Sequence, residues 1–255
     1  RPDGMVYDTC YARGEDENTW ITRFSEGGFY LPSPDKRFEM KRIPVENDVE
    51  YLFVEGLYFT WMATGDHEWM ARLLDRAIAA LDYSVRDTAY RFSEKYGLLK
   101  RGYTIDTWDF QSEHDRNVEG DIMRVRPGTT RFGVMHGDNT GYIAACRQLA
   151  EMLRRVGREE EAPKFEARAD EMEARLNALA WNGRYFRHHV REEPTDFDFG
   201  VDEASQVSLS NAYSMNRGIG EEKMRAIVST YKGIRDALPP GSPGEFISYC
   251  ANSGR

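Results

Sequence analysis

Residues 49–66 read VEYLFVEGLYFTWMATGD, and the apolar residues of this stretch recur at the spacing of an α-helix. Asn47 or Asp48 can cap the start of the helix, and Gly65 is typical of the position after a helix end. Asp66 opens a second helix, so the Thr-Gly-Asp turn predicts an antiparallel helix hairpin. The apolar stripes comprise Val49, Leu52, Phe53, Gly56, Leu57 and Met62 in the first helix, and Trp69, Leu73, Leu74, Ala77, Ile78 and Leu81 in the second.

The same pattern returns after a long loop. Asp138 or Asn139 is expected to cap a helix that ends at Gly157. A partner helix is predicted from about 159 to 180, with Pro163 in its first turn, where a missing N–H group costs little. These two helices predict a second hairpin.

A third pair is predicted over residues 203–216 and 221–237, and its second helix carries the stripe Met224, Ile227, Val228, Tyr231 and Ile234. Helix pairs separated by long aromatic and acidic loops fit a mainly α fold, the α/α toroid, in which loops at one end of a ring of helices form the pocket. With three pairs in sight, we expect an incomplete barrel over residues 46–255, preceded by an irregular N-terminal arm over 1–45.

Residues 102–112, GYTIDTWDFQS, have neither a helical nor a strand period, so we expect a loop. Asp106 and Asp109 flank Trp108 in this stretch. An indole can pack on a pyranose ring, and its apolar bulk can keep the pKa of a neighbouring carboxylic acid high enough for it to donate a proton. The ordinary alternative is a surface turn with a half-buried tryptophan.

Composition excludes several classes of function. A formal charge of −9 argues against nucleic acid or an anionic membrane as a partner, because binding phosphate requires a basic surface. The sequence holds no apolar run long enough to span a membrane. Cys10, Cys146 and Cys250 lie far apart and indicate free thiols in a reducing, cytoplasmic compartment. The chain starts at Arg1 rather than Met, and we expect it to be part of a longer protein.

Three stretches carry a family resemblance: residues 51–66, the run DNTGYIAACRQLA at 138–150 together with Trp181-Asn182, and DEASQVSLSNAYS at 202–214. In this order they resemble the six-hairpin glycosidases of the glycogen-debranching (amylo-α-1,6-glucosidase), trehalase and processing α-glucosidase group. The resemblance covers most of residues 44–216.

The resemblance implies a general acid in the central loop. Thr107-Trp108-Asp109-Phe110-Gln111-Ser112 is similar to the Gly-Trp-Asp-Phe-Ser-Ser form of the family loop, which places the acid on Asp109. Thr107 replaces the glycine and Gln111 replaces a serine, so Asp106 stays open as the alternative.

The family also implies hydrolysis with inversion of configuration. Inversion needs a second carboxylate that activates water and stands about 6.5–9.5 Å from the acid. The family places this base in a late loop, where Glu245 is the latest candidate in this chain; otherwise the base lies beyond Arg255.

Substrate-binding candidates are aromatic residues of the central loop and polar residues at predicted helix starts. Glu46, Asn47 and Asp48 precede the first helix, although a helix cap needs only one of them. The amide side chains of Gln206 and Asn211 can bind vicinal hydroxyls with two hydrogen bonds. Arg101 and Arg131 are further candidates, although an ordinary surface role fits them as well. The main candidates are Trp108, Phe110, Glu46, Asn47, Asp48, His136, Asp138, Asn139, Gln206 and Asn211.

Neither a cofactor nor a metal site is predicted. His188 and His189 are adjacent and would point to opposite faces of a strand, and the acidic run at 196–203 lacks the order of an EF-hand. No nucleotide-binding or acyl-hydrolase motif occurs. The resulting hypothesis is a glycoside hydrolase that acts on a small-molecule or oligosaccharide substrate, an α-glucoside or a related sugar, with its oligomeric state left open.

Two other classes of function fit the same sequence features. A toroid-type sugar epimerase or polysaccharide lyase would use His136 with Tyr142 or Tyr103 in place of paired carboxylates. A carbohydrate-binding protein would keep the aromatic platform without turnover.

Overall fold

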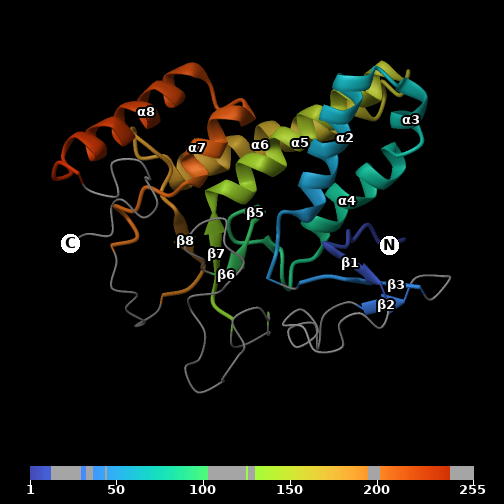
Figure 1. Ribbon diagram of the computed structural model, residues 1–255, viewed down its shortest axis with the longest axis horizontal. Helices are drawn as coiled ribbons and strands as arrows, with labels where there is room; N and C mark the ends of the chain where they lie inside the picture. Colours follow the sequence, from blue (N-terminus) through green and yellow to red (C-terminus); the bar gives the residue numbers. More distant parts are fainter. Residues whose placement is uncertain are drawn as a thin grey trace.

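The structure, a computed structural model, describes residues 1–12, 30–32, 37–43, 45–102, 125, 130–194 and 202–241. Helices dominate these residues, and three small antiparallel sheets accompany them (Figure 1). The helices are α2 (Val49–Thr64), α3 (His67–Ala71), α4 (Leu74–Arg86), α5 (His136–Arg155), α6 (Ala162–Ala180), α7 (Ser210–Ser214), the 3₁₀ helix η1 (Met215–Arg217) and α8 (Glu221–Asp236). None of the described helices has the length and apolar character that crossing a membrane requires.

The three sheets are short. The first pairs β1 (Thr9–Ala12) and β2 (Tyr30–Pro32) on either side of β3 (Phe38–Lys41). The second joins β4 (Phe92–Ser93) to β5 (Leu98–Leu99), and the third has the order β6 (Arg101–Gly102), β7 (Phe132–Met135) and β8 (His189–Arg191). In the third sheet Arg101 pairs with Gly133 and Met135 pairs with His189, so β7 leads directly into α5.

The first hairpin forms where it was predicted. Gly65 ends α2 with φ 68°, in the left-handed region that favours glycine, and its N–H donates to Trp61 O at 2.7 Å. The Asp66 carboxylate caps α3 by accepting from the N–H of Trp69 at 2.8 Å. The predicted second helix is, however, divided into α3 and α4 around Arg72.

The buried face of α2 was predicted only in part. Leu52 and Met62, which belong to the predicted stripe, are 41% and 57% exposed. The core instead takes Tyr51, Val54 and Trp61. Almost every position of α2 is apolar or aromatic, so its sequence permits more than one stripe, and packing against α5 decides which one is buried.

Helix α5 is the centre of the core and contacts α2, α4, α6 and α7. It is followed by Gly157 at φ +80°, as predicted. Its start was predicted wrongly: the helix begins at His136, and no side chain caps it. Asp138 and Asn139 therefore lie within the first turn, because β7 runs into the helix without an intervening loop.

The third helix pair is only partly as predicted. Residues 221–236 form α8, but the helix predicted over 203–216 is reduced to the short helices α7 and η1. Ile227 is buried, whereas Val228 of the predicted stripe is 37% exposed. Helices α2, α5 and α7 thus form an arc with α5 in the middle; α4 packs on α2 and α6 packs on α5 (Figure 1).

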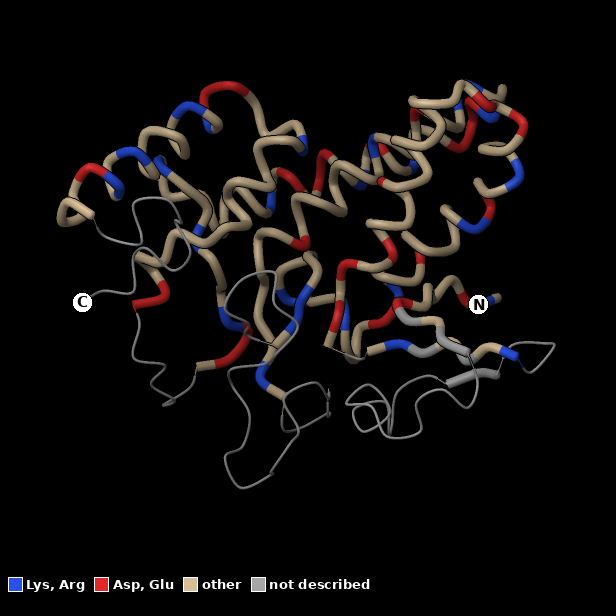
Figure 2. The backbone as a smooth tube through the Cα atoms, viewed as in Figure 1, with Lys and Arg blue, Asp and Glu red and all other residues tan. Residues whose placement is uncertain are grey.

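Charged residues of both signs are interspersed along the helices (Figure 2). Several form ion pairs that join helices, such as Lys164 of α6 with Asp82 of α4 at 2.8 Å and Arg147 of α5 with Glu173 of α6 at 2.6 Å. Exposed pairs of this kind contribute little to stability. Burial of the apolar core around α5 therefore carries most of the stability of the fold.

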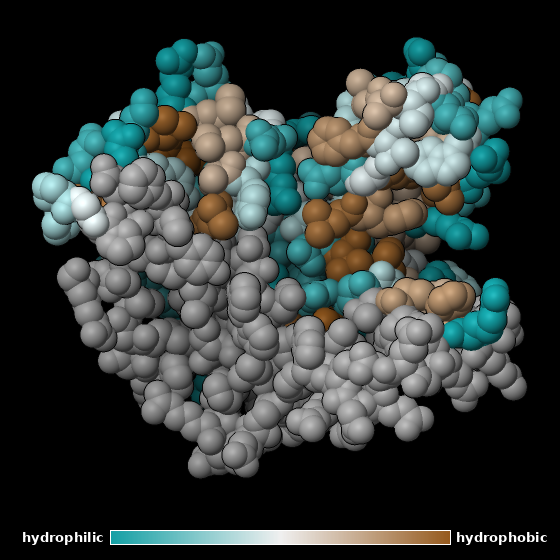
Figure 3. Space-filling view, in the orientation of Figure 1, coloured by the Kyte–Doolittle hydropathy of each residue, from teal (hydrophilic) through white to brown (hydrophobic). Residues whose placement is uncertain are grey.

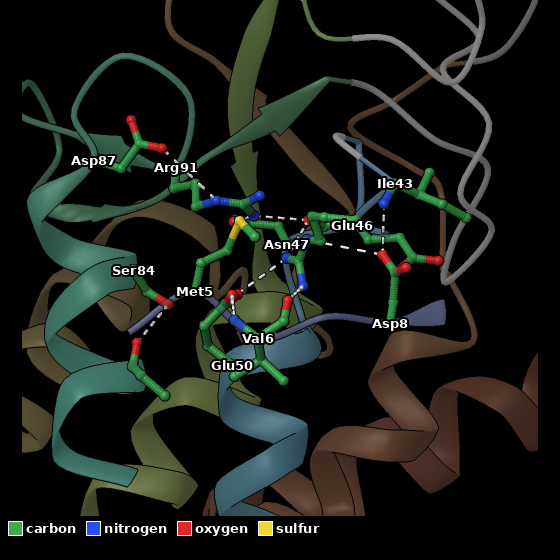
Figure 4. Close-up of polar contacts among 12 residues, drawn as sticks. Met5, Val6, Asp8, Ile43, Glu46, Asn47, Glu50, Ser84, Asp87 and Arg91 are labelled. Carbon is green, nitrogen blue, oxygen red and sulfur yellow. Dashed lines mark hydrogen bonds and ion pairs between the residues drawn. The ribbon is translucent and has the colours of Figure 1, made fainter. Parts of the chain in front are cut away.

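A buried polar network ties the N-terminal residues to the start of α2 (Figure 4). The Glu50 carboxylate accepts from the N–H of Val6 at 3.1 Å and from Nη2 of Arg42 at 3.0 Å, and both charged side chains are fully buried. Arg42 and Arg91 each donate to the carbonyl of Glu46 at 2.7 Å. The network fixes the position at which α2 begins.

Close approach of α2 to α5 depends on Gly141. A Cβ atom at this position would lie 2.3 Å from Cε2 of Tyr51, whose ring is buried and cannot swing aside. We therefore expect Gly141→Ala to lower the free energy of unfolding by about 1–3 kcal/mol, the usual cost of overpacking.

A matched control is available on α2. A Cβ atom at Gly56 would meet no other atom within 4 Å, and we expect Gly56→Ala to stabilise the protein by about 0.4–1 kcal/mol. Chemical denaturation of both variants measures the two changes. Equal stability of the two variants would contradict the described contact between α2 and α5.

Candidate functional site

A pocket of about 350 Å³ opens between the N-terminal ends of α2 and α5 and the α7–η1 segment. The space-filling view shows a hollow between the two groups of helices on this face (Figure 3). Tyr51 and Tyr213 provide aromatic surface, and Tyr213 is 44% exposed. The charged and amide side chains that line the pocket are Asp48, Glu55, Arg101, Asp138, Asn216 and Arg217.

Asp138 is the most unusual of these side chains. It is buried, and its Oδ1 atom lies 3.4 Å from Nη1 of Arg101. Its Oδ2 atom is buried without a hydrogen-bond partner among the described residues. Burial raises the pKa of the Asp138 carboxyl, and Arg101 opposes the shift. A buried carboxyl oxygen without a partner is costly, so its presence in a pocket points to a ligand.

Arg217 and Tyr51 form the wall next to Asp138. Nη1 of Arg217 donates to the carbonyl of Gly137 at 2.8 Å, and the guanidinium lies 5.3 Å from the centre of the Tyr51 ring. The pKa of Tyr51 is raised well above its ordinary value. Burial is the largest cause, and the negative charges of Asp138 and Asp48 raise the pKa further. The charged side chains of Asp48, Asp138 and Arg217 therefore all lie near the Tyr51 ring.

His136 lies behind the pocket rather than in it. Its ring is fully buried, stacks on Phe186 at 5.4 Å between ring centres, and its Nδ1 atom is 3.1 Å from the carbonyl of Arg187. Burial lowers the pKa of His136 from 6.5 to about 4. The ring is therefore neutral at physiological pH and supports the start of α5. The role of His136 in binding a substrate hydroxyl stays a prediction, and in this structure its ring does not line the pocket.

The lowered pKa of His136 predicts a pH dependence of stability. Between pH 6.5 and about 4 the unfolded chain binds a proton at this ring that the folded chain does not bind. The contribution of the neutral His136 ring to the free energy of unfolding is fully present above pH 6.5. It is lost as the pH falls toward 4, and the loss amounts to up to about 3 kcal/mol. Denaturant titrations at several pH values measure the slope, and His136→Gln should flatten it. An unchanged slope in this variant would contradict the neutral buried ring.

Three predicted substrate-binding amides hold the backbone instead. Asn47 donates to Lys100 O at 2.9 Å and accepts from Arg91 at 3.1 Å. Asn139 exchanges hydrogen bonds with the N–H and carbonyl of Leu99, and Asn211 does the same with Phe186. These hydrogen bonds satisfy buried backbone groups of Lys100, of β5 and of the Trp181–Phe186 turn, and the predicted binding role of the three amides stays a prediction.

Two other predicted residues also lie away from the pocket lining. The carbonyl of Glu46 accepts the two arginines of the buried network, and Gln206 is buried in a non-helical stretch before α7 rather than at a helix start. Asp48 and Asp138 are the predicted binding residues that do line the pocket. Asp106, Trp108, Asp109, Phe110 and Glu245 lie outside the described residues.

Sequence reasoning missed part of the pocket. Tyr51 and Glu55 follow Asp48 at intervals of three and seven residues, the spacing of one helix face, so the pattern around Asp48 could have revealed them. Arg101 was open to a surface role, but it is buried beside Asp138. Arg217 carries no sequence signal, because only the fold brings η1 to the start of α5.

His188 and His189 belong to the described residues, whereas residues 195–201, which hold most of the acidic run, lie outside them. Within the described part of the chain, no group of three or more His, Cys, Asp or Glu side chains is placed to hold a metal ion. Glu203 instead pairs with Arg191 at 2.9 Å and lies 3.5 Å from His189.

No protein-family model matches the sequence, and no curated protein matches it. Among solved structures, a rhamnosidase from Klebsiella oxytoca with rhamnose bound is similar, with a TM-score of 0.54 and 12% sequence identity over 94% of this chain. A GH78 family rhamnosidase of Bacillus sp. GL1 aligns over 78% of this chain with a TM-score of 0.46 and 17% identity. The alignments cover 36% and 18% of the lengths of those two chains.

The likeness to the Klebsiella protein shows the fold. The prediction of a mainly α arrangement of α/α-toroid type is confirmed. In the described residues α2 with α3–α4 and α5 with α6 form helix hairpins, and the third predicted pair is present only as α7, η1 and α8. The narrower resemblance to the debranching and trehalase group stays a prediction.

Proposed function

We propose that the protein is a glycoside hydrolase whose sugar-binding site is the pocket between α2 and α5. The observation that carries this proposal is Asp138, a buried carboxyl that lines the pocket and keeps one oxygen unpaired within the described part of the chain. Hydroxyl groups of a sugar can supply the missing partner, since each hydroxyl both donates and accepts. A volume of about 350 Å³ lies at the small end of ligand pockets and suits one or two sugar units.

The tyrosines support a carbohydrate rather than a small anion. Tyr213 is 44% exposed and gives the pocket aromatic surface on the α7 side, on which the apolar face of a sugar ring can pack, whereas Tyr51 lines the α2 side with its ring buried beneath Arg217. Both arginines of the pocket already contact protein acceptors, Arg101 at Asp138 and Arg217 at Gly137. A polyol with a partly apolar face fits this combination better than phosphate.

For the chemical step we propose that Asp109 protonates the glycosidic oxygen, with Asp106 as the alternative acid. The segment that carries both follows directly after Gly102, and the neighbouring Arg101 lines the pocket. Inversion needs a second carboxylate that activates water, for which Glu245 is the candidate within this chain. Trp108 and Phe110 are proposed to shape the subsite around the acid.

Two substrate classes follow from different observations. The resemblance of the sequence motifs favours an α-glucoside. The fold likeness to a rhamnosidase with rhamnose bound favours an α-rhamnoside. The epimerase or lyase alternative is less well supported, because neither His136 nor Tyr142 lines the pocket and the Tyr142 hydroxyl donates to Leu81 O at 2.7 Å inside the core.

Hydrolysis of 4-nitrophenyl α-glucoside and α-rhamnoside tests the proposal. We expect one of them to be cleaved, and Asp138→Ala to lower kcat/KM by roughly 10- to 100-fold through the loss of hydrogen bonds to a charged group. Glu68→Gln, an exposed change on α3, is the matched control. If the wild-type protein cleaves neither these substrates nor natural oligosaccharides, the proposal of hydrolysis is wrong.

A further inference from the structure

Two carboxylates, those of Asp48 and Glu55, line the α2 side of the pocket. Asp48 and Glu55 lie seven residues apart, two helical turns on one face, and both line the pocket. Asp48 occupies the cap position of α2, yet its side chain makes no capping hydrogen bond. Among the described residues neither carboxylate forms an ion pair, so their charges act on whatever occupies the pocket.

The two arginines of the pocket do not neutralise the carboxylates of Asp48 and Glu55. Arg101 is paired with Asp138 at 3.4 Å, and these two charges offset each other. Arg217 is held by the carbonyl of Gly137 and by the face of Tyr51. Two carboxylates therefore face the pocket against one arginine whose position is already fixed.

A separate observation supports a ligand in this place. Asp138 is only 6% exposed, and its buried Oδ2 atom has no hydrogen-bond partner among the residues that the structure describes. This atom is an acceptor for a hydroxyl or an amine, but it repels another carboxylate. The acceptor on the α5 side and the two carboxylates on the α2 side thus favour the same kind of ligand.

We propose that Asp48 and Glu55 are specificity-determining residues that admit uncharged sugars to the pocket and exclude sugars with a carboxylate. The inference rests on the proposed sugar-binding function. A carboxylate that enters a partly buried pocket loses water and meets two like charges within a few ångströms, where salt screens weakly. An uncharged sugar has no such charge and can donate hydroxyl hydrogen bonds to the same oxygens.

Calorimetric titration of the full chain tests this with two pairs of probes that differ only at C6, D-glucose against D-glucuronate and D-galactose against D-galacturonate, and with L-rhamnose as a further uncharged sugar. We expect the wild-type protein to bind an uncharged sugar at least about tenfold more tightly than a uronate. In Glu55→Gln, and more strongly in Asp48→Asn/Glu55→Gln, this ratio should fall by about tenfold. Glu68→Gln should leave the ratio unchanged, and raising the salt concentration should reduce it.

Equal binding of uronates and uncharged sugars, or a ratio that the double variant does not change, would overturn the specificity inference. These outcomes are separable from the fate of the proposed hydrolysis. Selective binding without cleavage of 4-nitrophenyl glycosides would refute the hydrolase while supporting the specificity. If the protein cleaves 4-nitrophenyl glucuronide as fast as the uncharged glycosides, the specificity inference is refuted and the proposed hydrolysis is supported.

Discussion

Replacing Glu50 with alanine is expected to lower the free energy of unfolding by about 3–5 kcal/mol, the cost of leaving a buried charge without its partner. The pKa of Arg42 is lowered mainly by burial and further by repulsion from Arg91. The Glu50 carboxylate opposes both effects. The variant would leave the N–H of Val6 without its acceptor, and the buried guanidinium of Arg42 would keep the more distant Asp8, 3.9 Å from its Nε atom, as its opposing carboxylate. For a chain of this size the change corresponds to a fall in Tm of roughly 6–20 °C.

Thermal unfolding of Glu50→Ala and of Glu68→Ala measures the effect, because Glu68 is exposed and serves as the matched control. A double-mutant cycle with Arg42→Met isolates the pair: the double variant should lose less stability than the sum of the single variants. A loss below about 1 kcal/mol in Glu50→Ala would contradict the buried network.

Replacing Asp109 with asparagine is expected to lower kcat for natural glycosides by about 10²–10⁴, the usual contribution of a general acid. The loss should be smaller for 4-nitrophenyl glycosides, because 4-nitrophenolate leaves as a stable anion and needs little protonation. KM should change much less than kcat, since the proposed role is proton transfer and not binding.

Asp106→Asn is the matched comparison, three residues away in the same segment. If the large, leaving-group-dependent loss appears in Asp106→Asn instead, the acid is Asp106. If both variants cleave natural glycosides at wild-type rates, neither residue takes part in the mechanism.

The network around Glu50 connects stability to the proposed function. Asn47 bonds the carbonyl of Lys100, and the next residue along the chain is Arg101, the partner of Asp138. The residue after Asn47 is Asp48, which also lines the pocket. The buried arginines therefore fix two walls of the pocket at once, which explains why polar groups occupy this part of the core.

Local chemistry made the helix pairs predictable. The αL glycine at position 65, the Asp66 cap and Gly157 act through backbone geometry that depends on neighbouring residues only, and each was located from the sequence. The start of α5 was not, because β7 continues into the helix and tertiary bonds replace the expected cap.

The site was less predictable than the fold. Polar residues at helix starts fit capping, binding and backbone support equally well, and only the fold separates Asp48 and Asp138 from Asn47 and Asn139. The face of α2 is decided by Gly141, which admits the ring of Tyr51 from a helix ninety residues away in the sequence. Contacts across such distances leave no local pattern.

The most direct test of the central claim is a nuclear magnetic resonance titration of the isotope-labelled full chain with L-rhamnose and D-glucose. The account predicts that one of these sugars shifts the backbone resonances of Tyr51, Gly137, Asp138 and Arg217, while those of α8 stay in place, and that Asp138→Ala weakens the effect. Shifts confined to α8 or to the α3–α4 turn, or none with either sugar at saturating concentration, would contradict a sugar site between α2 and α5.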